Sequence, residues 1–234
     1  MPRDPLRAFL QGMRDGAPFL LVIGPFGLLF GVVAREAGWN VVEILAMSVM
    51  VIAGASQFTA LQLMREEAPT LVVILTALAV NLRHAMYSAS LAPHLGPAPL
   101  LKRALVAYVL VDQTYGVAMN RYAIAPAMSA AEKTAYFLGV AAAICPPWYA
   151  FSVIGAYAGA AIPAWLALDF AVPITFIALF APALRSLPHL AAAFVSVVVA
   201  LLLAGLPYSL GLLIAATLAM LAGAGVEIAM GRRS

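Results

Sequence analysis

Residues 69–91 read PTLVVILTALAVNLRHAMYSASL, an apolar stretch with an arginine and a histidine near its middle. A helix that crosses a bilayer needs about 20 residues, so this stretch is long enough for one crossing. A charged side chain at that depth costs roughly 2.5–3.5 kcal/mol on insertion scales. Chains that retain such a residue direct it into the protein interior, a water-filled cavity or a counter-ion. We therefore expect Arg83 and His84 to belong to a functional site inside the membrane.

The composition places the whole chain in the same environment. Of the 234 residues, 65% are hydrophobic and 10% are charged, and the mean hydropathy is +1.00. A typical soluble domain has about 25% charged residues. The sequence predicts an all-α, polytopic transmembrane helical bundle that forms one domain over residues 1–234. Residues 1–16 are expected to form an amphipathic segment along the inner membrane surface.

Uncharged runs predict where this bundle crosses the membrane. We expect spans at 17–35, 41–64, 69–91, 101–120, 134–158 and 164–184, followed by one or two in 189–228. Eight spans with a cytoplasmic N-terminus place nine Lys and Arg residues inside and only Arg35, Lys102 and Arg103 outside, which follows the positive-inside tendency. Seven spans, which give seven inside and five outside, fit less well. The three tryptophans are expected near span ends or breaks: Trp39, Trp148 and Trp165.

Glycine and proline predict that several spans are broken. Transporters use such breaks at the bilayer midplane, where half-helix ends bind substrate and ions. A simple packing kink is an equal alternative for any one proline. The run 54–61 can also be aligned with 172–179, which suggests an internal repeat. The predicted breaks are Gly24-Pro25-Phe26-Gly27, Cys145-Pro146-Pro147 and Pro173.

Polar residues on the 69–91 span follow the helical period of 3.6 residues. They form two adjoining stripes, one of Asn81, His84 and Ser88, and the other of Arg83, Tyr87 and Ser90. A hydrogen-bonded core histidine is the alternative for His84, but the neighbouring Asn81 and Arg83 favour a functional role. Arg83 requires a counter-charge, and Asp112 lies well inside the 101–120 span. We predict an Arg83–Asp112 ion pair, with Asp112 and His84 as candidate proton carriers.

The 41–64 span offers a group of small polar residues. Ser56 and Gln57 follow Gly54-Ala55 and precede Phe58. Their side chains can donate to and accept from an amino or carboxylate group. Hydrogen bonding between helices is an equal alternative.

Other classes of site have no signal in this sequence. The single cysteine, Cys145, excludes an internal disulfide and a cysteine metal cage. The three histidines show no metal-ligand spacing, and no phosphate-binding loop is present. We expect no metal, cofactor, ATP drive or nucleic-acid partner.

Several of these motifs resemble the AzlC family, the large subunit of bacterial branched-chain amino-acid exporters. The resemblance covers about residues 15–185. It implies export of valine, leucine, isoleucine or methionine, driven by the proton gradient, and a small membrane partner of the AzlD type. Members often carry an acidic residue directly after the aspartate, where this chain has Gln113. The motifs are Gly54-Ala-Ser-Gln-Phe58, Asn81-Leu-Arg-His-Ala-Met-Tyr-Ser88, Ser90-Leu-Ala-Pro93, Asp112 and the Gly-Pro-rich first span.

The sequence thus predicts a secondary transporter subunit of the bacterial cytoplasmic membrane, and no enzyme. His84 and Asp112 would couple transport to protons, supported by Tyr87, Ser88 and Gln113. An intramembrane serine hydrolase with a Ser56–His84 dyad is an alternative, although Gln57 replaces the glycine expected beside the nucleophile. A non-transporting assembly or sensor subunit is the third. The predicted substrate-binding residues are Gly24, Pro25, Phe26, Gly54, Ser56, Gln57, Phe58, Asn81 and Arg83.

Overall fold

The computed structural model describes residues 4–159, 184, 186–206 and 210–231, and most of these residues lie in helices. No strand occurs in these ranges, so the predicted all-α architecture is confirmed. The helices form two compact units, one of Met1–Leu61 and Val80–Ala164, the other of Gln62–Ala79 and Trp165–Ser234. The assignment of the whole chain to one transmembrane domain stays a prediction.

Four helices in the described ranges are long and apolar enough to cross a membrane. The predicted spans 69–91 and 134–158 agree with α5 and α8 within a few residues. The span count of seven or eight stays a prediction, and the expected span 164–184, with Pro173 and the aligned run 172–179, lies outside the described residues. The four helices are Pro5–Glu36, Thr70–Leu95 (α5), Ala130–Gly159 (α8) and Leu210–Gly231 (α11).

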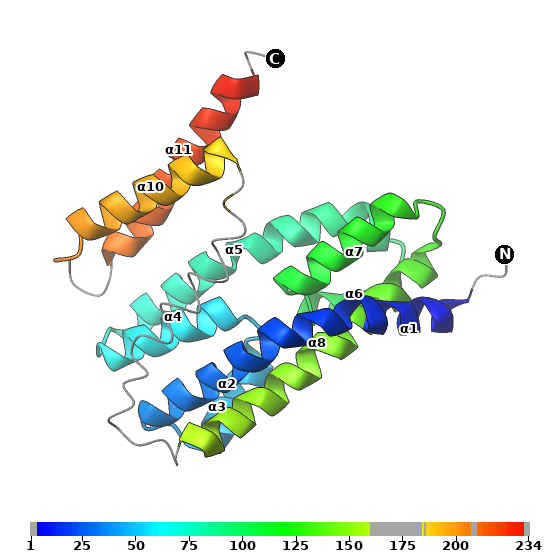
Figure 1. The fold of residues 1–234 in the computed structure, drawn as a ribbon, viewed down its shortest axis with the longest axis horizontal. Helices are drawn as coiled ribbons and strands as arrows, with labels where there is room; N and C mark the ends of the chain where they lie inside the picture. The colour runs from blue at the N-terminus through cyan, green and yellow to red at the C-terminus, as the bar shows by residue number, and fades with distance from the viewer. Residues whose placement is uncertain (1–3, 160–183, 185, 207–209, 232–234) are drawn as a thin grey trace. The chain divides into compact units, whose positions relative to one another are not determined.

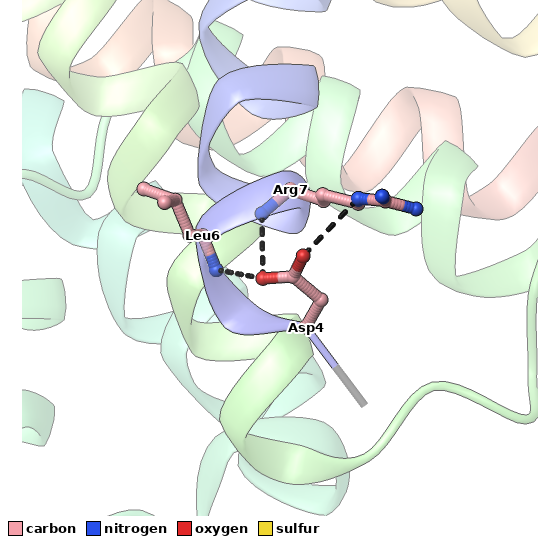
Figure 2. A network of polar contacts seen from close by, with 3 residues as sticks. All are labelled: Asp4, Leu6 and Arg7. Carbon is pink, nitrogen blue, oxygen red and sulfur yellow. Dashed lines mark hydrogen bonds and ion pairs between the residues drawn. The ribbon is translucent and has the colours of Figure 1, made fainter. Parts of the chain in front are cut away.

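The first crossing begins directly at the amphipathic N-terminal segment. Asp4 caps α1 (Pro5–Gly16), because its Oδ1 accepts from the backbone N–H groups of Leu6 and Arg7 at 3.0 and 3.2 Å (Figure 2). A short 3-10 turn, η1 (Ala17–Phe19), joins α1 to α2 (Leu20–Glu36). α1 is thus continuous with the helix of the first candidate span, and its position along the membrane surface stays a prediction. Its buried face of small residues, Ala8, Gly12 and Gly16, packs inside the first unit.

Glycines hold α1 and α2 against α8. A Cβ on Gly12 would overlap the carbonyl of Tyr136, and one on Gly31 would overlap the carbonyl of Ser152. A Cβ on Gly159 would stand 3.0 Å from the Cα of Val32. Small residues allow such close backbone approach between membrane helices. The contacts advance together along both helices, so α1–α2 and α8 run parallel, side by side in Figure 1.

The breaks predicted at prolines in the first and fifth spans are wrong. Pro25 lies inside α2, and Pro146 and Pro147 lie inside α8. Pro25 and Pro146 are exposed, so their rings lie on the outer sides of these helices. An interior proline removes one backbone hydrogen bond, while the glycine contacts with the neighbouring helix hold the remaining turns in place.

The predicted span 41–64 is a helical hairpin. It consists of α3 (Val41–Met50) and α4 (Gly54–Arg65), separated at residues 51–53. The Nε2 of Gln57 donates to the Oγ of Ser48 at 3.4 Å. Nine residues of continuous helix would place these two residues about 13 Å apart along the axis, so the bond shows that the chain reverses between them.

The predicted span 101–120 is likewise divided, into α6 (Leu100–Tyr108) and α7 (Asp112–Ile124). Thr114 stabilises the connection, since its buried hydroxyl accepts from the N–H of Val111 at 2.9 Å and lies 3.1 Å from the carbonyl of Val109. Interruptions inside a membrane require such partners for the freed backbone groups.

The direction of α7 shows that α6 and α7 form a second helical hairpin. Arg83 of α5 pairs with Asp112, and His94, eleven residues later on α5, lies 5.2 Å from Tyr122 between ring centroids. The contacts advance together, so α7 runs parallel to α5. Only residues 96–99 connect α5 to α6, so α6 starts at the end of α5 and α7 returns to it.

The two hairpins enter the first unit from opposite ends. The first begins four residues after α2, while the second begins where α5 finishes, close to the start of α8. His94 marks this end, because its Nδ1 lies 3.2 Å from the Nζ of Lys133. The turns of the two hairpins meet at their tips, the ends of α3 and α6. There the Tyr108 hydroxyl donates to the carbonyl of Val49 at 2.8 Å. The Tyr149 hydroxyl of α8 lies 3.2 Å from that of Tyr108.

The second unit contains an antiparallel pair, α10 (Leu187–Leu202) and α11. A Cβ on Gly223 would stand 3.3 Å from the Cβ of Ala192, and one on Gly211 would stand 2.8 Å from the Cβ of Leu203. The predicted one or two spans in 189–228 therefore correspond to two helices.

Candidate functional site

The predicted ion pair is present in the first unit. The Nη1 of Arg83 lies 2.9 Å from the Oδ2 of Asp112. Asp112 is the first residue of α7, where the positive end of the helix dipole stabilises a carboxylate. The two side chains are 23% and 40% exposed in the isolated chain. The break before α7 thus places the carboxylate opposite an arginine in the middle of α5.

Aromatic and polar side chains extend this pair along the two helices. The rings of Tyr87 and Tyr115 stack with centroids 4.2 Å apart, and the Tyr115 hydroxyl donates to the Oγ of Ser90 at 3.1 Å. The His84 ring lies 6.0 Å from that of Tyr87. We call Arg83, His84, Tyr87, Asp112 and Tyr115 the ion-pair cluster.

The ion-pair cluster retains unused hydrogen-bonding capacity. The Nε of Arg83, the Oδ1 of Asp112 and the Oδ1 of Asn81 are buried and have no hydrogen-bond partner within the described residues. Most buried polar groups in proteins are paired, so such atoms mark a place where a polar ligand or a proton can act. The arrangement can therefore bind a charged group or exchange a proton at the Asp112 carboxylate.

A second group of predicted residues gathers where α4 begins. The ring of Phe26 lies 4.9 Å from that of Phe58 and 5.8 Å from that of Trp148. Phe30 completes the group, at 5.5 Å from Phe58 and 6.1 Å from Trp148. We call these four rings the aromatic cluster. A Cβ on Gly54 would stand 2.7 Å from the Cε1 of Phe26, so glycine allows the rings to close on the start of the helix.

The polar residues of this second group are deeply buried. Ser48, Ser56 and Gln57 each have 0% exposed surface. The Oε1 of Gln57 and the Nε1 of Trp148 have no hydrogen-bond partner among the residues with described positions. The Ser48–Gln57 bond is a hydrogen bond between helices, as the alternative for this segment predicted. The amide oxygen of Gln57 makes no such bond.

The remaining predicted residues take different positions. Gly24 is buried, and its Cβ would stand 3.3 Å from the Cζ of Phe151. Gln113 is half-buried beside Asp112. Pro25 and Ser88 are exposed, so they lie away from both clusters. For Ser88 the helical period was correct, but the stripe that it shares with Asn81 and His84 continues onto the outer surface of α5.

Several residues of the two clusters were not predicted as site residues. Trp148 was expected near the break at Cys145-Pro146-Pro147, but α8 continues through this point and the Trp148 side chain is 6% exposed, so that expectation is wrong. Phe30 and Tyr115 look like ordinary apolar or interfacial residues in the sequence. The signal for Tyr115 is its spacing of three residues from Asp112 on the same helix face. No group of three His, Cys, Asp or Glu side chains in the described part of the chain could hold a metal ion.

Comparison with known proteins gives the family. A family model described as AzlC protein matches residues 18–162, more than half of the chain. A membrane protein of Archaeoglobus fulgidus described as uncharacterized is 29% identical over 181 residues, which cover 76% of each chain. The inner membrane protein YgaZ of Escherichia coli K12 is 27% identical over 174 residues, 72% of this chain and 70% of YgaZ. No solved structure matches. Both clusters lie within the matched residues, and the chain belongs to the AzlC family.

Proposed function

We propose that the protein is a secondary transporter subunit that exports branched-chain or other small apolar amino acids across the bacterial cytoplasmic membrane, coupled to protons. The Arg83–Asp112 pair is the observation that supports this most. Ionised groups within a membrane span are costly and typically line substrate or proton pathways. Family membership and the membrane-protein relatives support a transporter-like role, and the name of YgaZ supports an inner membrane.

The proposed roles follow from the two clusters. Protonation of Asp112 would remove its charge and release Arg83, and reionisation would restore the pair, so proton binding changes the connection between α5 and α7. His84, whose ring lies 6.0 Å from that of Tyr87, provides a second group that can bind a proton. The aromatic cluster would accept the aliphatic side chain of the substrate, while Ser56 and Gln57 would contact its polar groups.

A small membrane subunit of the AzlD type is the proposed partner. The face of α5 that carries Leu78, Leu82 and Met86 is exposed in the isolated chain, at 59%, 64% and 66%. A surface of this kind is satisfied by lipid or by another membrane helix, so the partner assignment depends on the family resemblance.

The transport proposal is tested in proteoliposomes that contain the chain with its partner subunit. We expect valine efflux that accelerates when the proton gradient drives protons in the direction opposite to valine. This efflux should collapse when an uncoupler is added. Liposomes with the partner subunit alone serve as the control. Absence of valine, leucine, isoleucine and methionine efflux under an imposed gradient would exclude the proposed activity.

We further propose that the hairpins are re-entrant, each entering the membrane and returning to the same side. Basic residues support this orientation. The end of the first unit where α1 begins has Arg7, Arg14, Lys102, Arg103, Arg121 and Lys133, whereas the opposite end has Arg35. The positive-inside tendency then places the former end in the cytoplasm. In the eight-span prediction, Lys102 and Arg103 lie outside.

Cysteine labelling distinguishes the two topologies. Cys145 is 3% exposed and can be replaced by alanine to give a background without thiols. In that background we expect Lys102→Cys to react with a membrane-impermeant maleimide from the same side as Arg14→Cys, and Glu36→Cys to react from the other side. Reaction of Lys102→Cys from the side of Glu36→Cys would show a full crossing at 101–120.

A further inference from the structure

We propose that the first turn of α4, together with Trp148 and Gln57, binds the carboxylate and the ammonium group of an α-amino acid. This inference depends on the proposed transport of amino acids and specifies where the substrate head group lies. It also assigns a substrate contact to Trp148, which the sequence placed near a break in its span.

The second helix of each hairpin, α4 in the first and α7 in the second, begins with a different charge. The first turn of α7 contains Asp112, which is paired with Arg83. The first turn of α4 contains no acidic residue. Backbone N–H groups at the start of a helix lack intrahelical partners and attract anions. A substrate carboxylate would therefore interact with the N-terminus of α4 as the Asp112 carboxylate interacts with the N-terminus of α7.

Two buried polar atoms indicate the chemistry of a ligand that would fit this place. Trp148 is 6% exposed and Gln57 is 0% exposed, and their Nε1 and Oε1 atoms have no hydrogen-bond partner in the described ranges. The indole N–H can only donate, and the amide oxygen can only accept. A ligand that pairs with both must offer an acceptor to the indole and a donor to the amide, as the carboxylate and the ammonium group of an α-amino acid do.

The geometry places both side chains beside the start of α4. The Cη2 of Trp148 would stand 3.1 Å from a Cβ on Gly54, the first residue of the helix. Gln57 follows three residues later, at the end of the first turn. The rings of Phe26 and Phe30 lie within 6.1 Å of the Trp148 ring between centroids, so the surroundings favour a ligand with an apolar side chain.

Arg83 is a less suitable carboxylate ligand than the sequence suggested. Its guanidinium already pairs with Asp112 at 2.9 Å. A substrate carboxylate at Arg83 would stand beside the Asp112 carboxylate, and the two like charges would repel each other. At α4 no protein carboxylate of the first turn competes for the same place.

Binding measurements with substrate analogues test this assignment on the chain with its partner subunit. The ligands are radiolabelled L-valine, 2-methylpropylamine, which lacks the carboxylate, and 3-methylbutanoate, which lacks the ammonium group. We expect Trp148→Phe to weaken valine binding about 10- to 100-fold, the usual effect of losing a hydrogen bond to a charged group. The affinity for 2-methylpropylamine should not change, which also shows that the variant is folded.

The second variant and the control address the other half of the ligand. Gln57→Leu should weaken valine binding by a similar factor without changing the affinity for 3-methylbutanoate. Trp39→Phe, at a half-buried position outside the aromatic cluster, should bind all three ligands like the unmodified chain. If the unmodified chain transports valine and Trp148→Phe keeps its preference for valine over 2-methylpropylamine, the subsite is wrong and the transport function stands. If the unmodified chain neither binds nor transports an amino acid, both are wrong.

Discussion

Replacing Arg83 with glutamine is expected to reduce valine efflux about 30-fold, because it leaves the Asp112 carboxylate inside the membrane unit without its counter-charge. Removing one partner of a buried, hydrogen-bonded charge pair typically costs about 2–5 kcal/mol. The lower end applies here, since the Arg83 and Asp112 side chains are 23% and 40% exposed. Initial rates of proton-driven efflux in proteoliposomes measure the effect. Arg103→Gln, at an exposed position in α6, is the matched control and should retain full activity.

The double variant Arg83→Gln/Asp112→Asn separates structure from proton coupling. It keeps side chains of similar size and leaves no unpaired charge, so we expect its thermal stability to return toward that of the unmodified chain. If Asp112 exchanges the coupled proton, efflux should stay low in the double variant. Recovery of proton-driven efflux would show that the pair only connects α5 to α7, and would remove Asp112 from the proposed mechanism.

Replacing Gly31 with alanine is expected to have the largest effect on folding. The added Cβ would overlap the carbonyl of Ser152 and would stand 2.6 Å from the N atom of Ala156. Both are backbone atoms of α8, so relief requires α2 and α8 to separate along their shared length. Overpacking typically costs about 1–3 kcal/mol, and occasionally more, and we expect a value at or above the upper end of that range.

The change is measured as the melting temperature in detergent, followed by fluorescence size-exclusion chromatography. Gly116→Ala is the control, because no heavy atom lies within 4 Å of the added Cβ. This substitution should keep or raise the melting temperature, since alanine favours a helix over glycine by about 1 kcal/mol. Equal melting temperatures for Gly31→Ala and the unmodified chain would contradict the close contact between α2 and α8.

The Arg83–Asp112 pair could be predicted because few charges occur at membrane depth. An arginine in the middle of an apolar helix requires a partner, and Asp112 was the carboxylate placed well inside a predicted span. Electrostatics therefore determined a contact between residues 29 positions apart in the sequence. Tyr115 was missed because tyrosine side chains occur at many membrane positions without contributing to a site.

The hairpins could not be predicted from hydropathy. Two short apolar helices with an apolar turn between them have the same hydrophobic length as one crossing helix, so 41–64 and 101–120 fit a single span equally well. The difference lies in local hydrogen bonds, such as those that Thr114 makes around residues 109–111. A threonine three residues beyond Val111 is a weak signal, although it has the spacing of a helix cap.

For the prolines, the sequence predicted helix breaks that the structure does not contain. Proline is a strong local signal, and the sequence interpretation placed breaks at Pro25 and at Pro146-Pro147. In the structure these residues lie within helices whose neighbours are fixed by glycine contacts between α2 and α8. A helix that loses one hydrogen bond continues when its remaining turns are packed, and this packing between distant segments is not visible in a local pattern.

The bond from Tyr108 to the Val49 carbonyl has a consequence for leakage. Withdrawal of either hairpin would leave the carbonyl of Val49, which is 39% exposed in the isolated chain, without a donor, and an unpaired backbone carbonyl that faces lipid costs several kcal/mol. In a transporter of the proposed kind, this bond would hold the two hairpins together between transport cycles and so limit the leakage of ions through the protein. In the proposed transport cycle, substrate or proton binding must supply the free energy that separates the hairpins. The same contact that limits leakage would therefore also limit the rate of transport.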